Sequence, residues 1–127
     1  AVAQGRPVAA WRAQHEAAIL AELLELVSIP NVAGNDDEMR RNAALLQRLF
    51  ERRGFTVEQT TGAGSPVVFA KLDVPDARGT LTLYIHYDGQ PVDPAEWTRC
   101  QPFAPCVYAA AGEVPRTALQ GPLDPEW

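Results

Sequence analysis

The chain has 127 residues, about the length of one domain, and its 46% hydrophobic and 21% charged residues are typical of a soluble globular protein. Eleven basic residues against sixteen acidic ones give a formal charge of -5, which disfavours a nucleic-acid or anionic-membrane surface. No apolar run approaches the roughly 18 to 20 residues that a membrane span requires. We therefore expect a small or protein-like partner, with no nucleic acid and no membrane.

The two ends of the chain suggest a longer parent protein. Ala1-Val2-Ala3, followed by Gln4, resembles the small-residue end of a secretory cleavage site, although no basic or apolar region precedes it. A trimmed sequence would begin in the same way, so a periplasmic or secreted location and a cytoplasmic one are equally open. After Gly121 the chain reaches Trp127 without a capping helix or closing strand. We therefore expect further residues to follow in the complete protein.

Apolar residues recur at helical spacing from Ala9 to Val27, which predicts a first helix with one wide buried face. Pro30 ends this helix, because proline cannot donate the next backbone hydrogen bond. The expected buried rows are Ile19, Leu23 and Leu26, with Leu20, Leu24 and Val27 beside them.

A second helix is predicted between Asn35 and Gly54. Asn35 is the expected N-cap, and Glu38 occupies the third helical position. Acidic side chains in the first turn are stabilised by the positive end of the helix dipole. Gly54 supplies a left-handed C-terminal cap. The expected inner face consists of Met39, Ala43, Leu46, Leu49 and Phe50.

Beyond Gly54 the apolar period changes to two, which indicates strands. Three strands are predicted, over residues 55–60, 67–74 and 80–87, and the third is apolar enough to lie inside a sheet. Seven of the eleven prolines fall between Pro91 and Pro125, which predicts a mostly irregular tail. The expected fold class is α/β, with two helices followed by three strands and a proline-rich tail.

His86 and Asp88 carry the chemistry of the third predicted strand. Because side chains alternate along a strand, the two point to the same side and lie about 6 to 7 Å apart along the backbone. The aspartate can then accept a hydrogen bond from one ring nitrogen while the other faces a metal. Gly89 and Pro91 break the strand here, at the carboxyl end where α/β sheets present binding sites. A purely structural hydrogen bond between the two side chains is the alternative.

The sequence around this pair resembles the first metal-binding motif of a dinuclear zinc metallopeptidase family. Residues 80–94 read TLTLYIHYDGQPVDP, and Glu96-Trp97 and Pro102-Phe103 follow at the usual distances. The family includes aminoacylase, carnosinase-type dipeptidases, glutamate carboxypeptidases, acetylornithine deacetylase and succinyl-diaminopimelate desuccinylase. The motif is most similar to the dipeptidase branch. The segments Leu26-Val-Ser-Ile-Pro30 and Arg53-Gly-Phe extend the resemblance over nearly the whole chain.

The resemblance implies that His86 ligates one of two zinc ions and that Asp88 is the catalytic-site residue bonded to it. Cobalt or manganese are alternative metals. The implied reaction is hydrolysis of a peptide or N-acyl amide bond, of the dipeptidase or carboxypeptidase type, in a small peptide or N-acyl amino acid. The implied fold is a three-layer α/β/α domain, and residues 1–127 would be a truncated N-terminal portion of it. The resemblance also allows the complete protein to be a homodimer.

The remaining metal ligands and the glutamate general base of such enzymes are expected beyond Trp127. A catalytic zinc needs roughly three protein ligands, so we predict that this chain alone is inactive. The alternative from a different class is a non-catalytic α/β binding or interaction module in which His86 and Asp88 form only a structural hydrogen bond.

Cys100 and Cys106 are separated by five residues, which fits neither a zinc knuckle nor a redox pair. Their state is left open, as a disulfide if the protein is exported or as inert thiols otherwise.

Overall fold

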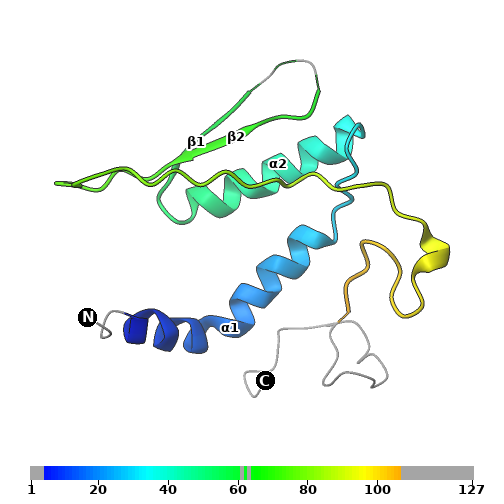
Figure 1. The fold of residues 1–127 in the computed structure, drawn as a ribbon, viewed down its shortest axis with the longest axis horizontal. Helices are drawn as coiled ribbons and strands as arrows, with labels where there is room; N and C mark the ends of the chain where they lie inside the picture. Colours follow the sequence, from blue (N-terminus) through cyan, green and yellow to red (C-terminus); the bar gives the residue numbers. More distant parts are fainter. Residues whose placement is uncertain (1–4, 61, 63, 107–127) are drawn as a thin grey trace. The chain divides into compact units, whose positions relative to one another are not determined.

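The computed structural model describes residues 5–60, 62 and 64–106. They form two compact units, one made of residues 5–28 and 97–106 and the other of Ile29–Glu96. The first unit contains a long helix, and the second contains a shorter helix and two strands (Figure 1). In this described part, no helix combines the length and apolar character needed to cross a membrane.

Helix α1 spans Gly5–Val27 and ends at the expected residue, although it begins four residues earlier than Ala9. The Ser28 hydroxyl donates to the carbonyl oxygen of Glu25 at 2.8 Å, next to the last turn. The expected wide buried face is wrong: none of the described α1 side chains is buried, and Leu23 is 51% exposed. An apolar stripe is buried only where another element covers it, and residues 97–106 of the same unit contain no helix or strand.

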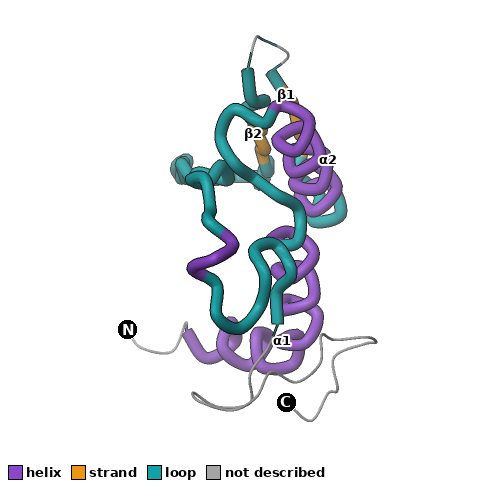
Figure 2. Tube along the Cα trace, turned by 90° about the vertical axis from the view of Figure 1, so that its right-hand side faces the viewer, coloured by secondary structure: helices purple, strands orange, loops and turns teal. Residues whose placement is uncertain are grey.

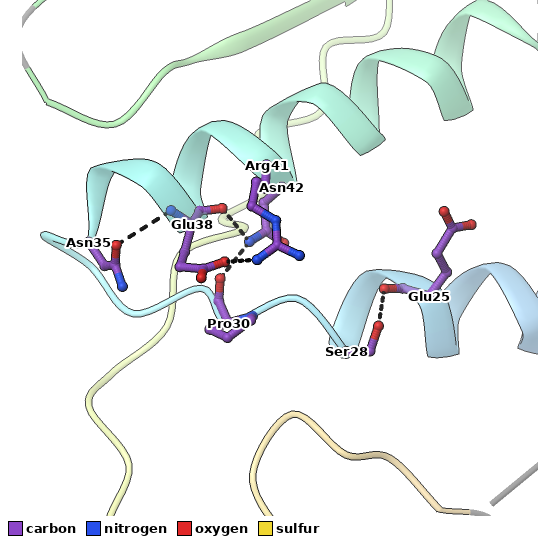
Figure 3. A network of polar contacts seen from close by, with 7 residues as sticks. All are labelled: Glu25, Ser28, Pro30, Asn35, Glu38, Arg41 and Asn42. Carbon is purple, nitrogen blue, oxygen red and sulfur yellow. Dashed lines mark hydrogen bonds and ion pairs between the residues drawn. The ribbon is translucent and has the colours of Figure 1, made fainter.

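Helix α2 spans Asp36–Glu51 and has the predicted caps. The Asn35 side chain accepts a hydrogen bond from the backbone N–H of Glu38 at 3.4 Å (Figure 3). At the other end, Gly54 has a φ of +83°, in the left-handed region that glycine adopts without a steric penalty. Both caps are set by residues within one helical turn, which explains why the sequence alone located this helix.

The core of the second unit lies on the inner face of α2. Met39 and Ala43 are fully buried there, as predicted, and Leu45 is 1% exposed. Asn42 is equally buried, and its Nδ2 donates to the carbonyl oxygens of Pro30 at 2.8 Å and Glu38 at 2.9 Å (Figure 3). The three other predicted inner-face residues of α2 are only partly buried, namely Leu46, Leu49 and Phe50.

Strands β1 (Thr56–Gln59) and β2 (Val68–Lys71) form an antiparallel hairpin that packs on α2 (Figure 2). Each strand is shorter than the range predicted for it. The register pairs Val57 with Ala70 and Gln59 with Val68, and these partly buried residues form one face of the hairpin. The amide of Gln59 donates to Oε1 of Gln47 on α2 at 2.6 Å, which joins the hairpin to the helix.

The third predicted strand, over residues 80–87, is an extended trace without strand pairing within the described residues (Figure 1). Its end is fixed by an isolated parallel bridge between Val32 and Gly89. A short 3-10 turn, Pro94–Glu96, follows. The structure is therefore a mixed α/β arrangement of two helices and a two-stranded sheet. Residues 97–106 are irregular as expected, and the rest of the predicted tail, 107–127, lies outside the described residues.

Candidate metal-ligand site

His86 and Asp88 lie side by side on the extended segment, as the sequence predicts. Nδ1 of His86 is 3.0 Å from Oδ1 of Asp88, within hydrogen-bond distance. The histidine side chain is 68% exposed and the aspartate side chain 43% exposed, so the pair is open to water. With Nδ1 taken up by the carboxylate, Nε2 is the ring nitrogen available to bind a ligand.

A tyrosine lies on each face of the segment near the pair. Tyr84 shares the face of His86 and Asp88, and Tyr87 lies on the opposite face. The ring of Tyr84 meets the ring of His86 edge to face, with 5.1 Å between the ring centroids. Tyr87 is partly buried, and its hydroxyl donates to the carbonyl oxygen of Pro66 ahead of β2. Burial raises the pKa of the Tyr87 hydroxyl, and the negative charge of Asp88 raises it further. The tyrosine is therefore a neutral hydrogen-bond donor that anchors the segment.

The carboxyl end of the segment is held by the loop that precedes α2. The backbone N–H of Gly89 donates to the carbonyl oxygen of Asn31 at 2.7 Å, and the N–H of Ala33 donates to the carbonyl oxygen of Gly89 at 3.0 Å. The Asn31 side chain adds a bond to the carbonyl oxygen of Tyr87 at 2.9 Å. A Cβ at position 89 would lie 2.9 Å from Oδ1 of Asn31, so a larger residue here would require the Asn31 side chain to shift.

Asn31 is the positioning residue that the sequence did not reveal. It lies 56 residues before Tyr87 in the chain, and a loop asparagine after Pro30 carries no pattern that would predict this contact. Gly89 offered a signal, because a glycine directly after a strand can mark a close backbone approach as well as a strand break.

Other polar residues do not complete a metal centre. His15 stacks on Trp11 of its own helix, with ring centroids 4.2 Å apart, and its Nδ1 lies 2.7 Å from the carbonyl oxygen of Trp11. Asp93 accepts a hydrogen bond from the N–H of Ala95 at the 3-10 turn. Among the residues that the structure describes, no cluster of three or more His, Cys, Asp or Glu side chains is arranged to hold a metal ion.

The two cysteines are joined in the first unit. Cys100 and Cys106 form a disulfide, with their Cα atoms 6.3 Å apart, inside the usual range for such bonds. Of the two states left open by the sequence, the structure contains the disulfide.

Comparison with protein-family models, curated proteins and solved structures finds no match to this chain.

Proposed function

We propose that His86 is a metal ligand and that the complete protein uses a pair of zinc ions to hydrolyse a peptide or N-acyl amide bond. The observation that supports the proposal is the 3.0 Å contact between Nδ1 of His86 and Oδ1 of Asp88 on an exposed ring. An aspartate in this position accepts the Nδ1 proton, fixes the tautomer and leaves the lone pair of Nε2 for a metal.

The chain fits one part of a dinuclear centre. His86 supplies one imidazole and Asp88 orients it, whereas each catalytic zinc needs about three protein ligands. The proposal therefore assigns the other ligands and the general base to the complete protein, and the chain alone is predicted to be inactive. When bound, the two ions would polarise the scissile carbonyl and lower the pKa of a water molecule. Cobalt and manganese are the alternative metals.

The proposed substrate is a small peptide or an N-acyl amino acid, and the proposed fold of the complete domain is a three-layer α/β/α arrangement. Further strands and a second helical layer would cover apolar side chains that this chain exposes. Phe69, on the face of the hairpin away from α2, is 58% exposed. Leu83 on the extended segment is 73% exposed. Large apolar side chains in such numbers usually mark surfaces that another element covers.

The second candidate is a non-catalytic α/β binding or interaction module. It is favoured by the lack of a third ligand beside the pair in the described part of the chain. In this case the hydrogen bond of His86 to Asp88 would only stiffen the end of the segment.

The two candidates differ in metal content. We expect the complete protein to copurify with two zinc ions per chain, measured by elemental analysis, and to hydrolyse dipeptides or N-acyl amino acids. The variant His86→Ala should lose activity, and Asp88→Asn should weaken metal binding roughly 10- to 100-fold. His15→Ala, which removes the other histidine, is the matched control and should change neither property. A metal-free complete protein that does not respond to added zinc would favour the module.

The orientation argument can be tested on this chain directly. Nitrogen-15 NMR of the imidazole should show the proton on Nδ1 of His86, with Nε2 unprotonated at alkaline pH. Asp88→Ala should remove this preference. A proton on Nε2 in the unmodified chain would contradict the proposed ligand geometry.

A further inference from the structure

Asp88 and Gly89 form an Asp-Gly pair, and the chain contains no other Asp-Gly and no Asn-Gly sequence. An aspartate before glycine is prone to ring closure with its own backbone, because glycine has no Cβ to hinder the approach of its amide nitrogen. Every other aspartate precedes a larger residue or a proline, which has no N–H. The sequence therefore concentrates this chemistry at one position, inside the candidate site.

Asn31 holds the two peptide groups that flank the Cα atom of Asp88. Its Nδ2 donates to the carbonyl oxygen of Tyr87 at 2.9 Å, and its own carbonyl oxygen accepts from the N–H of Gly89 at 2.7 Å. Ring closure requires the peptide group between Asp88 and Gly89 to turn, so that the nitrogen of Gly89 faces the side-chain carboxyl carbon. Both bonds oppose this turn, and the second also occupies the proton that the nitrogen must lose.

The carboxylate of Asp88 is open to water. Its side chain is 43% exposed, and its Oδ1 lies 3.0 Å from Nδ1 of His86. Water can therefore leave this carboxyl group and return to it without an opening of the core. The restraint on the reaction lies in the backbone contacts of Gly89 and not in the access of solvent.

We propose that Asp88 is a site of isoaspartate formation and that Asn31 controls its rate. The amide nitrogen of Gly89 bonds to Cγ of Asp88, and the amide proton leaves with the carboxyl hydroxyl group as water. Water then opens the succinimide ring at either carbonyl carbon. One opening returns aspartate, and the other leaves the main chain running through Cγ, as isoaspartate. The sum is an isomerisation that needs no reactant besides water.

Isoaspartate at position 88 separates the candidate ligand from its partner. The main chain gains one methylene group between residues 88 and 89, and the free carboxylate then sits directly on Cα. The two bonds from Asn31 no longer match this longer backbone, and the acceptor of the His86 ring is displaced. The inference is independent of the proposed function, because it uses only the contacts of Asp88 and Gly89.

The experiment incubates the full chain in neutral buffer and follows the tryptic peptide that ends at Arg99. Liquid chromatography with electron-transfer mass spectrometry distinguishes isoaspartate from aspartate. We expect isoaspartate to accumulate at Asp88. Asn31→Ala removes the bond to the carbonyl oxygen of Tyr87, and the loss of one hydrogen bond should accelerate accumulation about fivefold. Asp93 lies in the same peptide and is an internal control that should not react, because Pro94 has no N–H.

Asn35→Ala is the matched control, because it makes the same truncation at the N-cap of α2, away from Asp88. It should leave the rate at Asp88 unchanged, whereas an equal acceleration would mean that the reaction requires unfolding of the whole unit.

Asp88→Asn gives a second measurement that needs no change at Asn31. The asparagine closes the same ring and releases ammonia, so its conversion is followed by intact mass. The folded variant should react about tenfold more slowly than the same chain in concentrated urea, where the contacts of Asn31 are lost. The proposal is overturned if Asp88 gains no isoaspartate, if Asn31→Ala accelerates its formation no more than Asn35→Ala does, or if folding does not slow the reaction of the asparagine.

Discussion

Asn42 is the one buried polar side chain among the residues that the structure describes, so its replacement tests the packing described above. Its side chain is 1% exposed, and both of its Nδ2 bonds go to backbone carbonyl oxygens, of Pro30 and Glu38. Glu38 keeps its helical hydrogen bond without the side chain, whereas Pro30 loses a donor. One lost bond costs about 1 kcal/mol, and an unsatisfied carbonyl about 1 to 3 kcal/mol. We therefore expect Asn42→Leu to lower the free energy of unfolding by about 2 kcal/mol.

Asn42→Asp is expected to destabilise more, by about 3 kcal/mol or more at neutral pH. It places carboxylate oxygens against two carbonyl oxygens, and a buried unpaired charge is costlier than a missing bond. Burial raises the folded-state pKa of such a carboxyl above its unfolded value, so this deficit should shrink as the pH falls and the carboxyl is protonated. The measurement is urea unfolding followed by circular dichroism in dilute solution.

Asn35→Asp is the matched control, because it makes the same chemical change at an exposed N-cap. An aspartate there still accepts the hydrogen bond from Glu38, so the free energy of unfolding should change by less than about 0.5 kcal/mol. The reasoning is refuted if the aspartate at position 42 is tolerated as well as the one at position 35, or if Asn42→Leu is neutral.

Three further outcomes follow from the contacts around the site and the disulfide. Gly89→Ala would put a methyl group 2.9 Å from Oδ1 of Asn31, and we expect it to lower the free energy of unfolding by about 1 to 2 kcal/mol in urea titrations; an unchanged midpoint would show that the loop adjusts. The raised pKa of Tyr87 means that its contribution to stability is complete below the ordinary value of 10.0 and is lost as the pH rises through the higher folded-state value. Tyr87→Phe should therefore lose less stability than the unmodified chain between pH 9 and about pH 11, and equal losses would contradict this. Alkylation of the unreduced protein should leave Cys100 and Cys106 unlabelled in mass spectra, whereas two labels would show free thiols.

The sequence predicted best where neighbouring residues decide the structure. The N-cap of α2 at Asn35 and the left-handed Gly54 depend on contacts within one turn, and both are confirmed. The shared orientation of His86 and Asp88 also follows from local alternation, and the 3.0 Å contact confirms it.

Prediction failed where distant parts of the chain decide. The apolar stripe of α1 is buried only if another element covers it, and residues 80–87 pair only if another strand lies beside them. The spacing of apolar residues along the sequence does not show whether such a neighbour is present. The burial of Asn42 was not predicted, because the helical spacing was applied to apolar residues only. Asn42 nevertheless lies between Met39 and Leu46 on the same side of the helix. A polar residue inside such a row could have been recognised as a candidate buried donor.

The parallel bridge between Val32 and Gly89 has a consequence for local motion. It closes a long stretch of chain with three hydrogen bonds, and it lies outside the helix and the hairpin. Such a junction can open while the rest of the unit stays folded. The amide protons of Ala33 and Gly89 should then exchange with solvent at a common rate, because a single opening releases both.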